Sequence, residues 1–338
     1  KNFIKTKKKI YLLWIMCILA FILSAIIDNL TATIVLITIL RKLIKDNKDR
    51  VWFAGLIIIA ANAGGAWSPI GDVTTTMLWM GKKVSSIQLV KLLIIPSLIC
   101  MIIPTVIASF LKPFKDNFEP PKDEIKEIKY GSTMLVLGLA AIIFVPIFKT
   151  VTHLPPYVGM LLSLGVLWLV TEIIHRSKNH EVKSQLSVIG VLRKVDTPTI
   201  FFFLGILLAV ASLQSAGQLD IVATYLDTTF NGQTAEGIYI INVIIGLLSS
   251  IVDNVPLVAG AMGMYPVAET GFYAADGMFW EFLAYCAGTG GSVLIIGSAA
   301  GVAVMGILKI DFIWYVRNIS ILALIGYASG AITYILLQ

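Results

Sequence analysis

The chain consists of long apolar segments separated by short polar ones. Several apolar runs approach the ~20 residues that an α-helix needs to cross the roughly 30 Å hydrocarbon core of a bilayer. We predict transmembrane helices at residues 51–80, 88–111, 130–149, 156–174, 198–214, 279–308 and 312–337. Two further pairs of apolar segments, 10–27 with 30–44 and 237–252 with 255–268, are shorter and meet at polar residues. The pattern therefore predicts an all-α polytopic membrane protein.

Composition excludes the class of soluble proteins. Hydrophobic residues make up 57% of the 338 positions and charged residues only 14%, against roughly 25% charged residues in soluble domains. The net charge of +6 does not indicate a nucleic-acid partner, because the basic residues lie between apolar runs and form no nucleic-acid motif. Cys17, Cys100 and Cys286 all lie within apolar segments, so we expect neither a disulfide nor a metal site from them.

The distribution of charge predicts which segments face the cytoplasm. Basic residues typical of cytoplasmic loops are concentrated before residue 50, at 112–129 and at 175–194. No Lys or Arg occurs in 195–308, where the predicted loops around 220–236 and 269–281 carry only acidic charge. Both loops should therefore face outward. Lys82 and Lys83 do not fit this assignment, because they fall on the predicted outer side.

This assignment of loops to the two sides of the membrane requires each short pair of segments to enter and leave the membrane on the same side. The first pair connects cytoplasmic segments and predicts a re-entrant hairpin with its tip at Asp28 and Asn29. The second pair connects outer segments and predicts a hairpin that enters from the outside, with its tip at Asp253 and Asn254.

Two sequence motifs recur in the same order in both halves of the chain. SAIIDN at 24–29 matches SSIVDN at 249–254, and GGAWSPIG at 64–71 matches GGSVLIIG at 290–297. The spacings between the copies agree to within one residue. Because the charge pattern places the copies in opposite orientations, we predict two inverted repeats. Glycine-interrupted helices at matching places of such repeats are the best sequence indication of a transporter's binding site.

The repeat predicts three parts of the chain. Residues 1–111 would be the C-terminal part of inverted repeat 1, with its hairpin, broken helix and transmembrane helix. Residues 112–129 would be a cytoplasmic linker, and 130–338 would be inverted repeat 2. Counterparts of the first helices of repeat 2 would lie before Lys1, so we expect the first helices of repeat 1 to be missing from this sequence.

Three carboxylates are predicted to lie at membrane depth. Asp28 and Asp253 occupy the hairpin tips, and Asp72 follows the first glycine-rich motif. A carboxylate there costs several kcal/mol unless it is solvated, paired or protonated, so it is a candidate for function. The alternative is helix capping, because Asp at the start of a helix accepts hydrogen bonds from free N–H groups. We favour a functional role, since Ser, Thr or Asn would cap a helix at lower cost in lipid.

The glycine-rich motifs interrupt spans that are otherwise long enough to cross the membrane. Glycine weakens a helix and Pro69 removes a backbone donor, and irregular backbone at that depth is tolerated only against protein or a wet cavity. The freed carbonyls and the Ser and Thr hydroxyls are hard oxygen ligands that suit a small cation. The alternative is close helix packing through small residues, and it fits the second break better than the first. Glu172, Asp220 and Glu281 lie nearer segment ends and are not assigned to the site.

Four segments together carry a family resemblance: SAIIDNLT at 24–31, ANAGGAWSPIGDVTT at 61–75, DNVP at 253–256 and GTGGS at 288–292. They resemble the NhaD-type sodium/proton antiporters of the ion transporter superfamily, and the resemblance covers the whole chain. It implies two inverted repeats, each with a hairpin and a broken helix that meet at a central site. It also implies a homodimer in which a mobile transport domain moves against a scaffold.

The hairpin tips decide between a cation and an anion as the transported ion. Related carriers of di- and tricarboxylates have Ser-Asn-Thr at these tips, where hydroxyls, amides and helix N-termini hold an anion. This sequence has Asp-Asn at both tips, and carboxylates there would repel a dicarboxylate and attract sodium or lithium. We therefore predict a secondary transporter that exchanges Na⁺ or Li⁺ for H⁺, with both ions competing for Asp28, Asp72 and Asp253. An anion or arsenite transporter of the same superfamily is the alternative.

The predicted ion-binding residues are Asp28, Asn29, Thr31, Asp72, Thr74, Thr75, Asp253, Asn254 and Ser292. The residues predicted to support them are Ser24, Asn62, Gly64, Gly65, Ser68, Ser249, Thr289, Gly290, Gly291 and Ser298. A channel is disfavoured because paired breaks and hairpins suit a gated, occluded site. An enzyme is disfavoured because no predicted span contains His and the Asp residues form no recognisable catalytic motif. We expect no cofactor besides the transported ions, lipid and a second copy as partners, and a bacterial inner membrane as the location.

Overall fold

The computed structural model describes residues 8–118, 130–152, 154–176, 190 and 197–338. All regular secondary structure within these ranges is helical, apart from two isolated β-bridges. The chain divides into two compact units, one of Lys1–Lys122 with Val210–Gln338 and one of Asp123–Ala209. This division by contacts differs from the division into repeats, whose boundaries stay a prediction.

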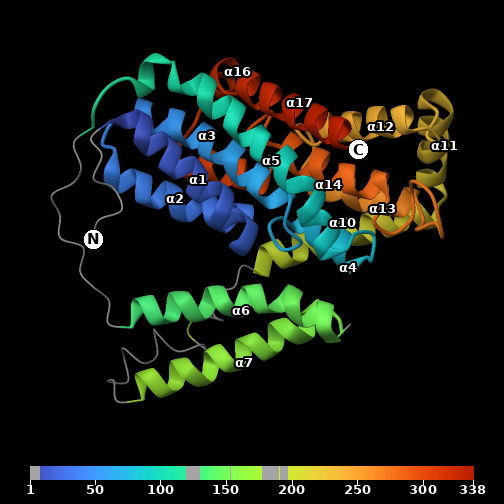
Figure 1. Cartoon of the computed structure of the whole chain (residues 1–338), viewed down its shortest axis with the longest axis horizontal. Helices are drawn as coiled ribbons and strands as arrows, with labels where there is room; N and C mark the ends of the chain where they lie inside the picture. The colour runs from blue at the N-terminus through green and yellow to red at the C-terminus, as the bar shows by residue number, and fades with distance from the viewer. Residues whose placement is uncertain (1–7, 119–129, 153, 177–189, 191–196) are drawn as a thin grey trace. The chain divides into compact units, whose positions relative to one another are not determined.

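The first half of the larger unit is built on a central buried helix. The helices in chain order are α1 (Lys9–Ile27), α2 (Asn29–Leu43), α3 (Asn47–Ala66), α4 (Val73–Met80), α5 (Ser86–Ser109) and the short 3-10 helix η1 (Lys112–Phe114). α1, α2 and α5 pack around α3 (Figure 1), which is buried along nearly its whole length. α3 and α4 are the two parts of the predicted broken helix, separated by residues 67–72.

The second half of the larger unit is also helical. It contains α11 (Gln218–Phe230), α12 (Ala235–Leu248), α13 (Asn254–Met264), α14 (Met278–Gly290), α15 (Ala299–Leu308), α16 (Phe312–Asn318) and α17 (Ser320–Leu337). α14 is buried from its second residue to its end, packs against α12 and also contacts α3 of the first half. α17 runs beside α5 (Figure 1), so helices from the two halves form one core.

The smaller unit contains α6 (Gly131–Thr152) and α7 (Pro156–His175), which lie side by side, and the first part of α10 (Thr197–Ser215). The Ser163 hydroxyl donates to the Ala141 carbonyl at 3.0 Å between α6 and α7. Most apolar side chains of these two helices are exposed within the chain. Apolar faces of this extent belong in lipid or against other protein.

The predicted spans agree with the helices, with two corrections. The segment around 220–236 was predicted to be a loop, but Gln218–Phe230 form α11. Residues with left-handed backbone, Gly217 and Asn231, bound this helix, and its mixed polar and apolar sequence hid it from a search for long apolar runs. The predicted span 312–337 is two helices, α16 and α17, and the α15–α16 pair is bent by 116°.

The structure confirms an all-α protein built for a membrane. Five helices of the described residues are long and apolar enough to cross a bilayer, and up to seven spans result if each bent pair counts as one. Both predicted hairpins correspond to pairs of helices that meet at the predicted tips, α1 with α2 at Asp28 and α12 with α13 at Asp253. The protein is therefore an integral membrane protein.

Candidate functional site

Four short helices of the larger unit begin at the tips and breaks that the motifs define. Asp28 precedes α2, Asp72 precedes α4, Asp253 precedes α13 and Ser298 precedes α15. The side chains of Asp28, Asp72 and Ser298 accept hydrogen bonds from backbone N–H groups of the following turn. Capping therefore occurs at three of these four positions, whereas Asp253 has no side-chain cap hydrogen bond.

Asp72 lies at the centre of a buried hydrogen-bond network and is only 2% exposed. Its Oδ1 accepts from the backbone N and the Oγ1 of Thr74 at 2.9 and 3.0 Å. Its Oδ2 accepts from Nδ2 of Asn29 at 2.6 Å and from Nδ2 of Asn254 at 3.2 Å. Because Asn29 and Asn254 lie at the tips of different hairpins, this carboxylate joins the two copies of the motif.

Asn62 extends the network to the second broken helix. This side chain is fully buried on α3, and its Oδ1 accepts from Nδ2 of Asn29 at 3.1 Å. Its own Nδ2 donates to the hydroxyls of Ser292 and Ser298 at 2.9 and 3.0 Å. The Tyr315 hydroxyl holds the same break by donating to the Ser292 carbonyl at 2.9 Å. The network thus runs through both hairpin tips and both breaks.

The other two predicted carboxylates have different surroundings. Asp28 accepts from the N and the Oγ1 of Thr31, both at 2.8 Å, so these two predicted ligands pair with each other within the first hairpin. Asp253 directly precedes Asn254, whose side chain donates to Asp72. Its Oδ1 is buried and, among the described residues, has no hydrogen-bond partner. Asp253 therefore has a buried oxygen without a hydrogen bond, whereas both carboxylate oxygens of Asp28 and of Asp72 accept hydrogen bonds.

Equivalent hydrogen bonds attach each hairpin to its broken helix. The Ser24 hydroxyl donates to the Ala61 carbonyl at 2.5 Å, and the Ser249 hydroxyl donates to the Ala287 carbonyl at 3.0 Å. These four residues occupy matching places in the two motif copies. The local structure is thus shared by both copies.

The paired glycines allow each hairpin to approach its broken helix closely. A side chain on Gly64 would collide with the backbone of Phe21, and one on Gly290 would collide with the backbone of Gly246. The second glycine of each pair instead faces a carbonyl of its own break, Gly65 at Gly71 and Gly291 at Gly297. Glycine is required here for close backbone approach.

The remaining predicted residues support the backbone of the breaks. The Ser68 hydroxyl donates to the Ala25 carbonyl at 2.6 Å. Thr75 forms a capping box with Asp72 at the start of α4. The Thr289 hydroxyl donates to the Tyr285 carbonyl within its own helix at 2.7 Å, so this bond lies outside the network.

The chain is similar to known membrane transporters. A family model described as citrate transporter matches residues 3–281. The chain is 45% identical to sodium/proton antiporter 1 and 41% identical to sodium/proton antiporter 2, both of Arabidopsis thaliana, over 98% of its length in each case. It is 32% identical to the Na⁺/H⁺ antiporter NhaD of Vibrio parahaemolyticus over 94% of its length. The chain covers 56%, 78% and 78% of these three proteins.

The chain belongs to the NhaD-type sodium/proton antiporter family. The resemblance in the four motif segments is thereby confirmed over nearly the whole chain. The relatives named here are transporters of bacterial and plant origin.

The sequence of this NhaD-family chain did not indicate how central some residues are to the hydrogen-bond network. Asn62 and Ser298 were predicted only as supporting residues, yet both are members of the central network. The isolated Asn within an apolar run was the available signal for Asn62. Tyr315 was not predicted, and nothing in its local sequence indicates its bond to the distant Ser292.

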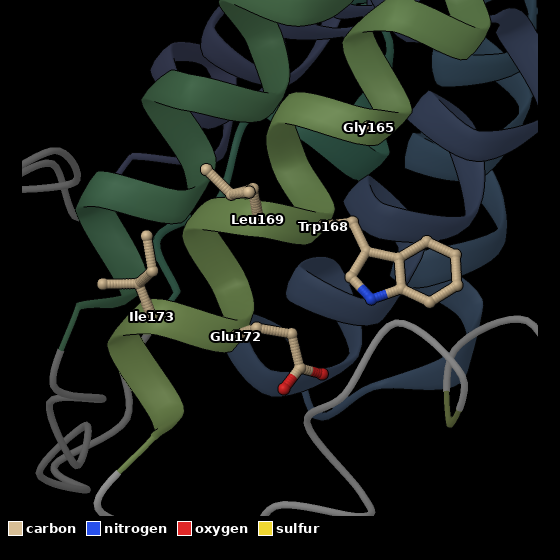
Figure 2. Close-up of a pocket in the computed structure, with 5 residues that line it drawn as sticks. All are labelled: Gly165, Trp168, Leu169, Glu172 and Ile173. Carbon is tan, nitrogen blue, oxygen red and sulfur yellow. The ribbon is translucent and has the colours of Figure 1, made fainter.

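An open hollow of this NhaD-family chain lies on the smaller unit. Gly165, Trp168, Leu169, Glu172 and Ile173 of α7 line an open hollow (Figure 2), in which Glu172 is the only ionisable side chain. A hollow on one helix with a single carboxylate lacks the convergent polar groups of a binding site. The network around Asp72 therefore remains the candidate site.

Proposed function

We propose that this chain is a secondary active transporter that exchanges Na⁺ or Li⁺ for H⁺. The observation that carries the proposal is the Asp72 carboxylate, buried at 2% exposure and bonded to the amides at both hairpin tips. A buried carboxylate is stable only when a proton, a cation or several hydrogen bonds compensate its charge. A site of this kind can hold Na⁺ and H⁺ alternately. The named activity of the relatives supports the same exchange.

The charge of the site favours a cation over an anion. Four helix N-termini meet the network, and each N-terminus carries a partial positive charge that alone would attract an anion. Three of the four residues at these N-termini are aspartates, Asp28, Asp72 and Asp253, and only Ser298 is neutral. Three carboxylates outweigh the partial charges of about half an elementary charge each. A tricarboxylate such as citrate, the substrate in the matched family's description, would be repelled here.

Asp72 and Asp253 are the proposed ion ligands in the exchange. Asp253 Oδ1 has no partner in the described structure and can accept a cation without first breaking a hydrogen bond. Asn29 and Asn254 now direct their amide nitrogens at Asp72, and an amide that turns over presents an oxygen instead. Bound Na⁺ would thus be held by carboxylate and amide oxygens, which are the hard ligands that it prefers. Departure of Na⁺ would leave one carboxyl to take a proton.

The proposed exchange depends on two inverted repeats. We propose that repeat 1 ends at residue 111, that 112–129 link the repeats, and that 130–338 form repeat 2 in the opposite orientation. Equivalent bonds from Ser24 and Ser249 support this arrangement, since they attach each hairpin in the same way. The larger unit would then carry the ion as the transport domain, and the exposed helices of the smaller unit would belong to a scaffold in a homodimer. Na⁺, H⁺ and lipid are the proposed partners, without a further cofactor.

The test is antiport in proteoliposomes that contain the purified protein and a pH-sensitive dye. Addition of Na⁺ or Li⁺ should move protons, and K⁺ serves as the comparison cation. Asp72→Asn and Asp253→Asn should each abolish the signal, while Glu172→Gln on the smaller unit is the matched carboxylate control and should retain it. Full antiport by Asp72→Asn with an unchanged pH profile would refute the assignment. If no cation moves protons and the protein takes up labelled citrate or arsenite, the anion alternative would be favoured.

A further inference from the structure

Glu281 is a buried carboxyl outside the proposed ion site. It lies in the first turn of α14 and is only 2% exposed, between the fully buried Trp280 and Phe282. From Glu281 the helix continues to Gly290 at the second break, which is about 14 Å at about 1.5 Å per residue. Glu281 therefore lies at the opposite end of α14 from the network around Asp72.

The repeated motif does not account for a carboxyl at this position. The matching glycines Gly64 and Gly290 are 226 residues apart, and the same spacing makes Gly55 on α3 the counterpart of Glu281. A Cβ on Gly55 would lie 2.6 Å from the Ile319 side chain, so the first copy has no room for a side chain here. The carboxyl is thus a property of the second copy alone.

Glu281 has a single hydrogen-bond donor. The Tyr334 hydroxyl of α17, itself buried, donates to Glu281 Oε2 at 3.1 Å. Oε1 is buried and has no hydrogen-bond partner among the described residues. Over the same residues, no Lys, Arg or His nitrogen lies within 4.0 Å of this carboxyl. Asp72 differs, because both of its carboxylate oxygens accept hydrogen bonds.

These contacts favour the neutral form of Glu281. A buried carboxylate needs several donors or a cation to offset its lost hydration, and Glu281 has one hydroxyl. A hydroxyl lies about 2.5–2.7 Å from an ionised carboxylate to which it donates, which is shorter than the 3.1 Å found here. The N-terminus of α14 favours negative charge, but the N–H groups of Phe279, Trp280 and Glu281 already donate to carbonyls. A neutral carboxyl is satisfied by one hydroxyl that can donate or accept.

The nearby charged groups have partners of their own. Lys83 lies over the Trp280 ring, 3.9 Å from its centroid, and donates to the Tyr265 carbonyl. Asp276, on the segment before α14, accepts from the Ser85 N–H. α14 packs against α3, α4, α5, α12, α13 and α17, of which α4 and α13 contain no ionisable side chain. The ionisable side chains of the others and of α14 are Lys48, Asp49, Arg50, Lys91, Cys100, Glu236, Tyr239, Tyr285, Cys286, Tyr327 and Tyr334.

We propose that Glu281 is a second proton-binding site of this chain, which holds a proton while α14 is packed against α17 and releases it when this end of α14 opens to water. Na⁺ does not compete for this proton, because the carboxyl lies outside the ion site. The proposal goes beyond the proposed function, and only its consequence for transport rests on that function.

The sign of the pH effect follows from the contacts of the two forms. A glutamate in water is ionised above about pH 5, so an opened Glu281 loses the proton that the packed form keeps. The packed form then binds one proton more, and rising pH favours opening by up to about tenfold for each pH unit. Glu281→Gln keeps the shape of the neutral carboxyl and cannot ionise, so it should remove this dependence.

Infrared difference spectroscopy of the purified protein in lipid at about pH 6 tests the proton directly. The wild type should show the carbonyl stretch of a protonated carboxyl that both Glu281→Gln and Glu281→Met lack. Glu236→Gln, which changes an exposed carboxyl at the start of α12, is the control and should keep this band. In Tyr334→Phe the band should move to higher frequency, because its hydrogen bond is lost. Absence of the band from the wild type, or its loss on adding Na⁺, would overturn the proposal.

Stability and transport measure what the proton does. Between about pH 5 and pH 7 the unfolding midpoint of the wild type should fall relative to that of Glu281→Gln, while Glu236→Gln follows the wild type. The antiport rate of Glu281→Gln should also vary less with pH over this interval than that of the wild type. Parallel pH profiles of stability in Glu281→Gln and wild type would contradict the proposal. Absence of antiport in every protein would refute the proposed function, while the infrared spectra would still decide the proton on Glu281.

Discussion

Replacing Gly64 by Ala should separate the first hairpin from its broken helix. A Cβ at this position would lie 2.7 Å from the Cα of Phe21 and 2.8 Å from its carbonyl carbon. Carbon atoms prefer separations of about 3.5–4.0 Å, so α1 and α3 must move apart by about 1 Å. Both obstructing atoms belong to backbone, and a change of rotamer cannot relieve the collision. Overpacking of this kind costs about 1–3 kcal/mol of the free energy of unfolding.

The same displacement should reach the ion site through the hairpin. Asn29 is the first residue of α2, separated from the end of α1 only by Asp28, and its Nδ2 lies 2.6 Å from Asp72 Oδ2. A shift of about 1 Å would lengthen this bond to about 3.6 Å, beyond the usual range of about 2.7–3.2 Å for a hydrogen bond. A hydrogen bond to a charged group is worth about 1.5–3 kcal/mol, and each 1.4 kcal/mol is a factor of about ten in affinity. We therefore expect the KM of Gly64→Ala for Na⁺ to change by about tenfold or more.

Two measurements on purified protein check this prediction. Thermal unfolding in detergent should show a midpoint lower by about 2–12 °C, from 2–4 °C per kcal/mol for large chains. Antiport in proteoliposomes should show the altered KM. Gly306→Ala is the matched control, because nothing lies within 4 Å of a Cβ on this exposed glycine of α15. Ala there should be neutral or stabilising by up to about 1 kcal/mol. Wild-type stability and KM in Gly64→Ala would refute the reasoning.

Further variants test the network and the stability of the core separately. Asn62→Ala removes one of the links between the halves and leaves the Ser292 hydroxyl without its donor. We expect a loss of about 1–3 kcal/mol in the free energy of unfolding and antiport reduced by about tenfold or more. Unchanged antiport would contradict this. Lys9→Met breaks the partly buried ion pair with Asp49 at 2.7 Å. It should lower the free energy of unfolding by less than the about 3–5 kcal/mol of a fully buried pair, without changing the KM for Na⁺. Asp49→Asn in the Lys9→Met background should restore part of the stability, and a further decrease would refute the pairing argument.

The sequence alone was sufficient for the membrane class and for the positions of most helices. A carboxylate in the middle of an apolar run is costly, and the same motif appears twice, so Asp28 and Asp253 could be recognised without coordinates. Glycine pairs inside long spans identified both breaks for a similar reason, because irregular backbone at membrane depth is tolerated only against protein or a water-filled cavity. The helix α11 was not recognised, since a short helix of mixed polarity lacks the long apolar run that identifies a span.

Tertiary structure decided which of the predicted residues meet. Local sequence gives equal weight to Asp28 and Asp72, yet Asp28 bonds to Thr31 on its own helix while Asp72 receives the amides of both hairpin tips. Contacts between Asn62 and Ser298 join residues that are 236 positions apart. Hydrophobic pattern and helix signals act over a few turns, so they fix the elements and their breaks. The direction in which each side chain points across the core depends on how the helices pack, and packing is a property of the assembled chain.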